Sequence, residues 1–327
     1  MRALTATRNP SRRLLSASSV STLALAAMLV SAPGGQLLAQ VAPNSAATQV
    51  RNADNGVPVV QIANPNAAGI SVNTYDAFNV SSRGVVLNNA TAADANAEGR
   101  VTTQLAGLVD INRNLTAPAR AILNEVTSTN PTVLAGYLEV AGQKADVIVA
   151  NPNGISCGGC GVINTAAFTL TTGRSRIDGT GQLLGFDVTG GTIALTGAGL
   201  DAQTTDYAAL LGRKIALGGP AYGKVLDVVG GAHRWDYQAR TASALAGVGA
   251  APDYAIDSTA VGGIYANRIR LIATEAGVGV RLLGDAAAVA DDLTITAAGD
   301  LELRASISAA RDLAIAAGSA GAGDLTA

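Results

Sequence analysis

The stretch that decides the fold runs from Ala145 to Gly173 and reads ADVIVANPNGISCGGCGVINTAAFTLTTG. Its Val147–Val149 run is apolar and β-branched, which predicts a short strand buried on both faces. Asn151–Gly154 then favours a type I turn, because the asparagine bonds back to the backbone and the proline fixes φ. In Phe168–Thr172, alternate residues share one face. This period of two predicts a half-buried strand that ends at Gly173.

The chain has two cysteines, Cys157 and Cys160, and they flank two glycines. Because the chain starts with an export leader, described below, the pair favours a small disulfide loop worth about 2 kcal/mol. A thioredoxin-like redox pair would need a helix starting at the first cysteine, and the glycines oppose a helix. Zinc needs four ligands, and two thiols with one histidine are too few. The simplest interpretation is a structural disulfide.

These residues carry a family resemblance. Asn151 to Ile155, the cysteine pair and the following INT…TLTTG resemble the amino-terminal secretion domain of two-partner-secreted exoproteins. That family covers filamentous haemagglutinins, haemolysins and contact-dependent inhibition proteins. The resemblance continues through four further segments, which are Gly69–Asn89, Ile122–Val149, Gly199–Tyr207 and Ala255–Leu283.

The resemblance implies an all-β fold, namely a right-handed parallel β-helix with an N-terminal cap and extra-helical hairpins. It also implies a secretion motif at Asn151, Pro152, Asn153, Gly154 and Ile155. This turn can act by contacting a transporter directly or by supporting the fold, and the sequence leaves both roles open.

A second, degenerate motif consists of Asn112, Arg113, Asn114 and Leu115, and occupies the place of the family's Asn-Pro-Asn-Leu signature. Arg113 stands where proline is expected. Because arginine does not fix φ, this turn should be less preorganised by a few tenths to about 1 kcal/mol. Shortly after it, residues 117–123 favour a helical turn.

The composition suits a thin, repetitive core. The chain has 327 residues, of which 14% are charged and 3% aromatic, and its 38 glycines accompany apolar residues that are mostly small. The formal net charge is −2, and no block of lysine or arginine follows the leader. We therefore expect no nucleic-acid partner.

Residues 1–39 read as a signal peptide, cleaved after Ala39. A basic segment with Arg12 and Arg13 precedes the apolar run Val20–Val30, which is too short to span a bilayer. The paired arginines also resemble a twin-arginine signal. No later stretch is long and apolar enough for a transmembrane helix, so the mature chain is expected in the periplasm or beyond.

We expect residues 40–283 to form the secretion domain and residues 284–327 to begin a β-helical repeat region. In that tail, Asp-Leu starts at positions 292, 300, 312 and 324. Steps of 8 and 12 residues add up to about 20, roughly one turn of a β-solenoid. The chain then ends in mid-repeat, which favours a fragment or a truncated gene of a longer exoprotein.

The resemblance implies a non-enzymatic secretion module of a large adhesin, haemagglutinin or contact-dependent inhibition toxin, with no cofactor and no metal. Its implied partner is an outer-membrane β-barrel transporter with periplasmic recognition domains. The module would fold at the surface of a Gram-negative cell, where a receptor on a host or neighbouring cell is a further candidate partner.

Two rival functions compete with this interpretation. A β-helical polysaccharide lyase would need clustered carboxylates with a metal and a basic group, and the scattered carboxylates do not provide them. A free-standing adhesin would bind a receptor itself. His233, the only histidine, lies in residues 232–240, which read as a loop or an extra hairpin. We expect it to be a surface histidine rather than part of a catalytic triad.

Overall fold

The computed structural model describes residues 41–318 and 325–326, which form β-strands joined by turns and loops. The expected leader, residues 1–39, lies outside the described residues. Within the described part of the chain, no helix is long and apolar enough to cross a membrane. The strands form three long sheets, here called A, B and C, and two small antiparallel sheets.

Sheet A contains, in spatial order, β1 (Val41–Pro43), β4 (Ile70–Phe78), β8 (Ala121–Val126), β11 (Ala145–Ala150), β14 (Thr165–Thr171), β19 (Tyr207–Leu211), β22 (Val225–Gly230), β27 (Arg268–Ala273), β30 (Leu293–Ala297) and β33 (Leu313–Ala317). Sheet B contains β2 (Gln49–Asn52), β3 (Pro58–Gln61), β5 (Val85–Asn89), β10 (Tyr137–Gly142), β13 (Cys160–Ile163), β18 (Leu200–Ala202), β21 (Ala221–Gly223), β26 (Ile264–Ala266), β29 (Ala286–Ala288) and β32 (Ile307–Ala309). Sheet C contains β9 (Thr132–Leu134), β12 (Ile155–Cys157), β17 (Thr192–Leu195), β20 (Lys214–Leu217), β25 (Tyr254–Ser258), β28 (Gly279–Leu282), β31 (Leu301–Leu303) and β34 (Leu325–Thr326).

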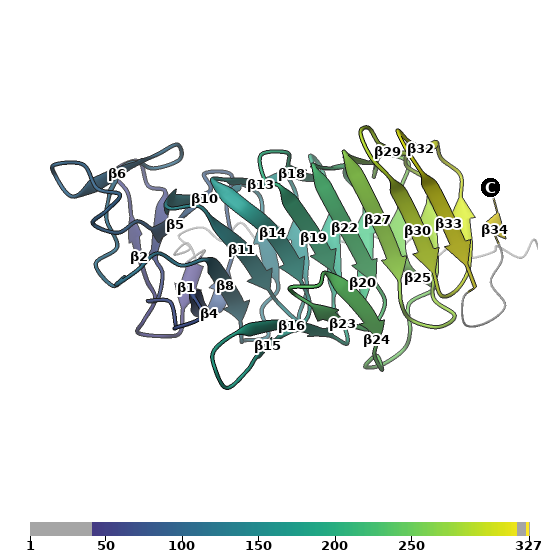
Figure 1. Ribbon diagram of the computed structural model, residues 1–327, viewed down its shortest axis with the longest axis horizontal. Coiled ribbons are helices and arrows are strands. Elements are labelled where there is room, and N and C mark those ends of the chain that lie inside the picture. The colour runs from purple at the N-terminus through teal and green to yellow at the C-terminus, as the bar shows by residue number, and fades with distance from the viewer. Residues whose placement is uncertain (1–40, 319–324, 327) are drawn as a thin grey trace, which may run out of the picture. The chain divides into compact units, whose positions relative to one another are not determined.

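The chain winds through sheets B, A and C in turn, so that β10, β11 and β12 make one coil and β13, β14 and β17 the next. Apart from β1 and β2, the strands of these three sheets pair in parallel with their equivalents in the neighbouring coils (Figure 1). In sheet A, for example, Val147 pairs with Ile122 on one side and Phe168 on the other. This is a parallel β-helix, and the predicted fold class is confirmed.

The first coil is closed by strands of opposite direction. β1 pairs antiparallel with β4, and β2 pairs antiparallel with β3. These two strands form the cap at the N-terminal end of the solenoid. A hairpin of β6 (Arg100–Thr103) and β7 (Gly107–Asp110) is inserted after β5.

The interior is filled by files of identical or similar side chains. In sheet C, Ile155, Ile193, Ile215 and Ile256 pair in succession, and each is at most 1% exposed. One residue per coil in each file suffices to fill the narrow interior. Because each coil covers the apolar face of the next, stability accumulates coil by coil.

A four-stranded antiparallel sheet lies against the outer face of sheet A. Its strands are β15 (Arg174–Ile177), β16 (Leu183–Val188), β23 (His233–Asp236) and β24 (Thr241–Ala244). Phe186 and Trp235 from this sheet pack with Ile148 and Leu211 in a second apolar cluster. The extra-helical hairpins implied by the family resemblance are thus present (Figure 1).

The same sheet corrects the prediction of a half-buried strand at residues 168–172. Thr169 is 4% exposed and Thr171 is fully buried, although both point away from the solenoid core. Phe186 and its neighbours cover that face. A second correction concerns residues 117–123. They form no helical turn, because β8 begins at Ala121.

His233 lies in β23 and is fully buried, so the expected surface position was wrong. Its Nδ1 lies 2.7 Å from the carbonyl oxygen of Gly231 and donates to it, while Nε2 has no hydrogen-bond partner among the described residues. Burial lowers the pKa of His233 to about 4. The residue is therefore neutral in the folded protein at pH 7.

This burial predicts a pH-dependent loss of stability. The unfolded chain takes up a proton near the ordinary pKa of 6.5, whereas folded His233 does so only near 4. The free energy of unfolding should therefore fall as pH drops, by about 2 kcal/mol between pH 7 and pH 5. Urea unfolding at both pH values should reveal this loss in the wild type and a smaller one in His233→Leu. Equal losses in both proteins would contradict the assignment.

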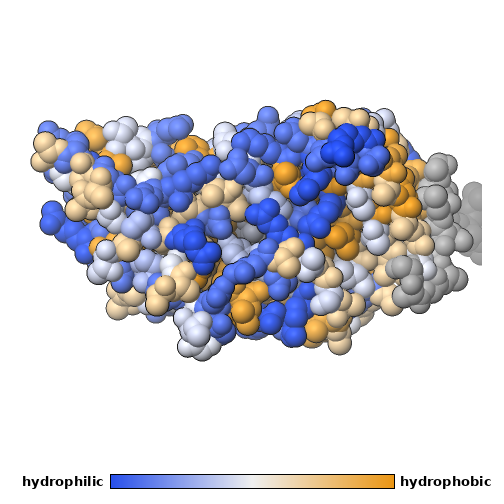
Figure 2. Space-filling model, viewed as in Figure 1, coloured by the Kyte–Doolittle hydropathy of each residue, from blue (hydrophilic) through white to orange (hydrophobic). Residues whose placement is uncertain are grey.

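The tail repeats as its sequence predicts. Leu293 pairs with Leu313, which lies 20 residues further along the chain, the length of one coil. The apolar surface in Figure 2 gathers toward the end of the solenoid that β30 and β33 form. In β33, Leu313 is 47% exposed and Ile315 37% exposed.

Candidate functional site

The Asn151–Gly154 segment forms a tight turn between β11 and β12. The Gly154 amide donates to the Asn151 carbonyl oxygen at 3.1 Å, which closes the turn. The Asn153 amide donates to Asn151 Oδ1 at 2.9 Å. Among the described non-glycine residues only Asn164 and Arg240 have positive φ, so Asn153 does not. This excludes a type II turn, which needs positive φ at its third residue, and fits type I.

The Asn151 side chain fastens this turn to the coil before it. It is fully buried, and its Nδ2 donates to Asn130 O and to Thr132 Oγ1, both at 2.9 Å. Asn153 Nδ2 donates to Ser128 O at 2.8 Å. Hydrogen bonds from two side-chain amides thus hold the turn to the preceding corner. Pro152 stays half-buried, and Asn153 is exposed.

The second motif has the same geometry despite its missing proline. The Leu115 amide donates to Asn112 O at 3.1 Å, and the Asn114 amide donates to Asn112 Oδ1 at 3.0 Å. Asn112 is 1% exposed, and its Nδ2 donates to the carbonyl oxygens of Ile62 and Asn88 at 2.9 and 3.0 Å. Each motif therefore uses its first asparagine as a buried clamp between coils. Arg113 and Asn114 are exposed.

Arg113 occupies the turn position that proline prefers, and this predicts a stabilising substitution. Arg113→Pro should raise the free energy of unfolding by about 0.4–1 kcal/mol, because proline restricts the unfolded chain without disturbing the turn. Urea unfolding of the two proteins measures the difference. Asn114→Pro is the matched control. It should destabilise, since the Asn114 amide is needed for the bond to Asn112 Oδ1. A loss of stability in Arg113→Pro would contradict the shared turn geometry.

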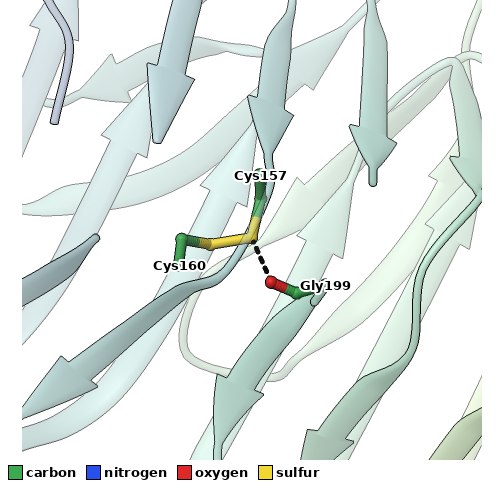
Figure 3. The surroundings of a disulfide bond; sticks show 3 residues. All are labelled: Cys157, Cys160 and Gly199. Atoms are coloured by element: carbon green, nitrogen blue, oxygen red, sulfur yellow. Dashed lines mark hydrogen bonds between the residues drawn. A yellow bond between two sulfur atoms is a disulfide. The ribbon is translucent and has the colours of Figure 1, made fainter. Parts of the chain in front are cut away.

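Cys157 ends β12 and Cys160 begins β13, and the two are disulfide-bonded with a Cα–Cα distance of 5.4 Å. Figure 3 shows the bridge at the corner between sheets C and B, beside Gly199 of the following coil. Cys157 Sγ lies 3.1 Å from Gly199 O. A disulfide sulfur has no proton to donate, so this is a packing contact. Both cysteines are fully buried.

A cavity of about 210 Å³ lies in the N-terminal cap beside the second motif. Its walls include Arg51 from β2, Arg100 from β6, and Arg113, together with Asp54 and Asp110. No pattern in the sequence predicts this cavity, because its lining comes from segments far apart in the chain. Charges of both signs face it, so the lining favours no single class of ligand.

The lyase alternative would require carboxylates gathered around a metal ion. Among residues 41–318 and 325–326, no group of three or more histidine, cysteine, aspartate or glutamate side chains is placed to hold one. The charged groups instead form pairs across neighbouring coils, such as Arg281 with Asp257 at 2.8 Å.

The chain is thus a parallel β-helix with asparagine-clamped turns and a disulfide at one corner. Residues 37–303 match the family model of the TPS secretion domain, and the chain belongs to that family. The chain is also similar to a crystal structure of the filamentous hemagglutinin secretion domain, with a TM-score of 0.74 and 36% sequence identity. That match covers 88% of this chain and 99% of the other.

Relatives in sequence are contact-dependent inhibition proteins. The chain is 47% identical over 260 residues to the 16S rRNA endonuclease CdiA of Enterobacter cloacae subsp. cloacae, covering 79% of this chain. It is 41% identical over 295 residues to the toxin CdiA of Yersinia pestis, covering 90% of this chain. It spans only 8% and 9% of the lengths of these two proteins. The resemblance to two-partner-secreted exoproteins, including the contact-dependent inhibition branch, is confirmed.

Proposed function

We propose that residues 40–283 are the N-terminal secretion module of a longer exoprotein, and that an outer-membrane β-barrel transporter recognises this module in the periplasm. The observation that carries this proposal is the family match over residues 37–303. The module itself would perform no catalysis. The nuclease and toxin names of the relatives describe much longer proteins, so an effector activity for this chain would reside in sequence beyond the module.

Folding supplies a physical drive for export. A coil that reaches the exterior buries its apolar face on the coil already there, which stabilises by about 25 cal/mol per Å² removed from water. Because each coil needs only its neighbour, folding can proceed while the rest of the chain is still unfolded. Residues 284–327 would continue the stack as the start of a repeat region, which the pairing of Leu293 with Leu313 supports.

The test is secretion with and without the partner. The chain is produced in a Gram-negative host with its cognate transporter, with an unrelated outer-membrane barrel, or with neither. We expect the protein in the medium only with the cognate transporter. Equal amounts in the medium under all three conditions would overturn the proposal. Cell-binding tests on the secreted protein separate a pure secretion module from a free-standing adhesin.

We propose that the Asn151–Ile155 motif acts mainly by holding the coil corner together. Asn151→Ala removes the bonds from Nδ2 to Asn130 O and Thr132 Oγ1, and it removes the Oδ1 acceptor of the Asn153 amide. This should cost about 2–3 kcal/mol of stability and slow secretion several-fold. Pro152→Ala leaves the hydrogen bonds of the Asn151 side chain in place and serves as the control. If the transporter reads the turn directly, Pro152→Ala will slow secretion without a matching loss in stability. Normal export of an Asn151→Ala, Asn153→Ala double variant would refute a secretory role for the motif.

A further inference from the structure

Three tyrosines and one aspartate form a file along the outer face of sheet B. Tyr137 pairs with Gly161, Gly161 with Asp201, Asp201 with Tyr222, and Tyr222 with Tyr265. Their strand neighbours Leu138, Leu200, Ala221 and Ile264 are buried in the solenoid core, so the file faces outward. The three tyrosines and Asp201 are each partly exposed. We call these four residues the tyrosine file.

Glycines allow the rings to lie close to the backbone. A β-carbon at Gly161 would come within 2.4 Å of Tyr137 Cε1, and one at Gly263 within 2.6 Å of Tyr265 Cε2. The Tyr222 and Tyr265 rings stack with centroids 5.4 Å apart and planes 20° apart. The rings are therefore fixed in place before any ligand arrives. Such preorganisation reduces the entropy cost of binding.

The polar groups of the file are also fixed. Tyr137 donates its hydroxyl proton to Asp201 Oδ2 at 2.7 Å, and this bond raises the pKa of Tyr137. Asp201 Oδ1 accepts from the Gln203 amide at 3.1 Å. The carboxylate thus sits between the rings as an acceptor with lone pairs to spare.

Two lysines close to the file in sequence share one carboxylate. Lys144 and Lys224 lie 3.5 and 2.9 Å from the carboxylate of Asp206. Against these two lysines stand the carboxylates of Asp201, Asp206 and Glu139 of β10, so the surface offers no excess positive charge to an acidic ligand. A nucleic acid or an acidic polysaccharide would require such an excess.

We propose that the tyrosine file binds a neutral glycan. The apolar C–H face of a sugar ring packs on an aromatic ring, and its hydroxyls donate to the Asp201 carboxylate. From Tyr137 to Tyr265 the file crosses four coil steps, about 19 Å at the usual strand spacing. That length accommodates several sugar units. This binding goes beyond secretion and does not depend on it.

The test is affinity electrophoresis of the purified full chain in gels that contain dextran, galactomannan or mixed-linkage β-glucan, with heparin as the acidic probe. At least one neutral polysaccharide should retard the protein, and heparin should not. Tyr222→Ala should weaken the binding by about tenfold or more. Tyr254→Ala removes a partly exposed tyrosine from sheet C and should leave binding unchanged. Both variants should also be secreted normally, because neither touches the Asn151 turn.

A second variant tests the carboxylate. Asp201→Asn keeps the shape of the side chain but removes its charge, and it should weaken binding several-fold while its unfolding midpoint stays near that of the wild type. The proposal is overturned if none of the neutral polysaccharides retards the protein. It is also overturned if heparin alone does so, or if Tyr222→Ala binds as well as the wild type. The file would then serve only to brace neighbouring coils.

Discussion

Replacing Arg213 by leucine is expected to lower the free energy of unfolding by about 3–5 kcal/mol. Arg213 Nη2 and Nε donate to the two carboxylate oxygens of Glu275 at 2.7 and 3.0 Å. Its Nη1 donates to Val248 O. The two side chains are only 7% and 14% exposed. Without Arg213, the Glu275 carboxylate would remain largely buried with no cation to balance it.

Urea unfolding at pH 7 measures this loss. Arg234→Leu is the matched control, because Arg234 forms the same two-bond pair with Asp187 but is 47% exposed. That variant should lose no more than about 1 kcal/mol. Arg213 lowers the pKa of Glu275. Its removal therefore raises that pKa, and Arg213→Leu should lose less stability in acid than at pH 7. Equal losses in the two variants would show that burial does not decide the effect.

Replacing Gly199 by alanine is expected to cost about 3–4 kcal/mol. Gly199 has φ +69°, which alanine adopts only under strain, and an added β-carbon would lie 1.8 Å from the Pro220 carbonyl oxygen. The backbone cannot easily retreat, because Gly199 O accepts from the amides of Gly159 and Cys160 in the preceding coil. Left-handed strain contributes about 1 kcal/mol and overpacking the rest.

Gly197 provides the comparison, since it lies two residues earlier in the same corner. Its φ is +54°, yet nothing lies within 4 Å of an added β-carbon. Gly197→Ala should therefore lose only about 1 kcal/mol. Heat or urea unfolding of both variants separates backbone strain from the clash with the next coil. The explanation fails if the two variants are equally stable.

The local features of the fold were accessible from sequence because their causes are local. β-branched runs give the strand at Val147–Val149, and turn chemistry gives the corner after it. The equivalence of the second motif to the first was only partly visible. The sequence difference at Arg113 concerns only the proline position. The buried side-chain amide of Asn112 supplies the bonds to Ile62 O in the preceding coil and to Asn88 O.

Features that depend on distant segments were not accessible. Thr169 and His233 were assigned to partly or fully solvated positions, and both are buried under residues that arrive from other parts of the chain. The tyrosine file was missed for the same reason. Tyr137, Tyr222 and Tyr265 stand 85 and 43 residues apart, because insertions make the coils unequal in length. No fixed period in the sequence identifies them as neighbours.

The disulfide between Cys157 and Cys160 has a topological consequence. It joins residues three apart in the chain, so it closes only a small loop and links no distant segments. The unfolded, oxidised chain can still pass end to end through a narrow pore, because the bridge widens the chain only locally. Under the proposed export route, oxidation in the periplasm is therefore compatible with passage through the transporter.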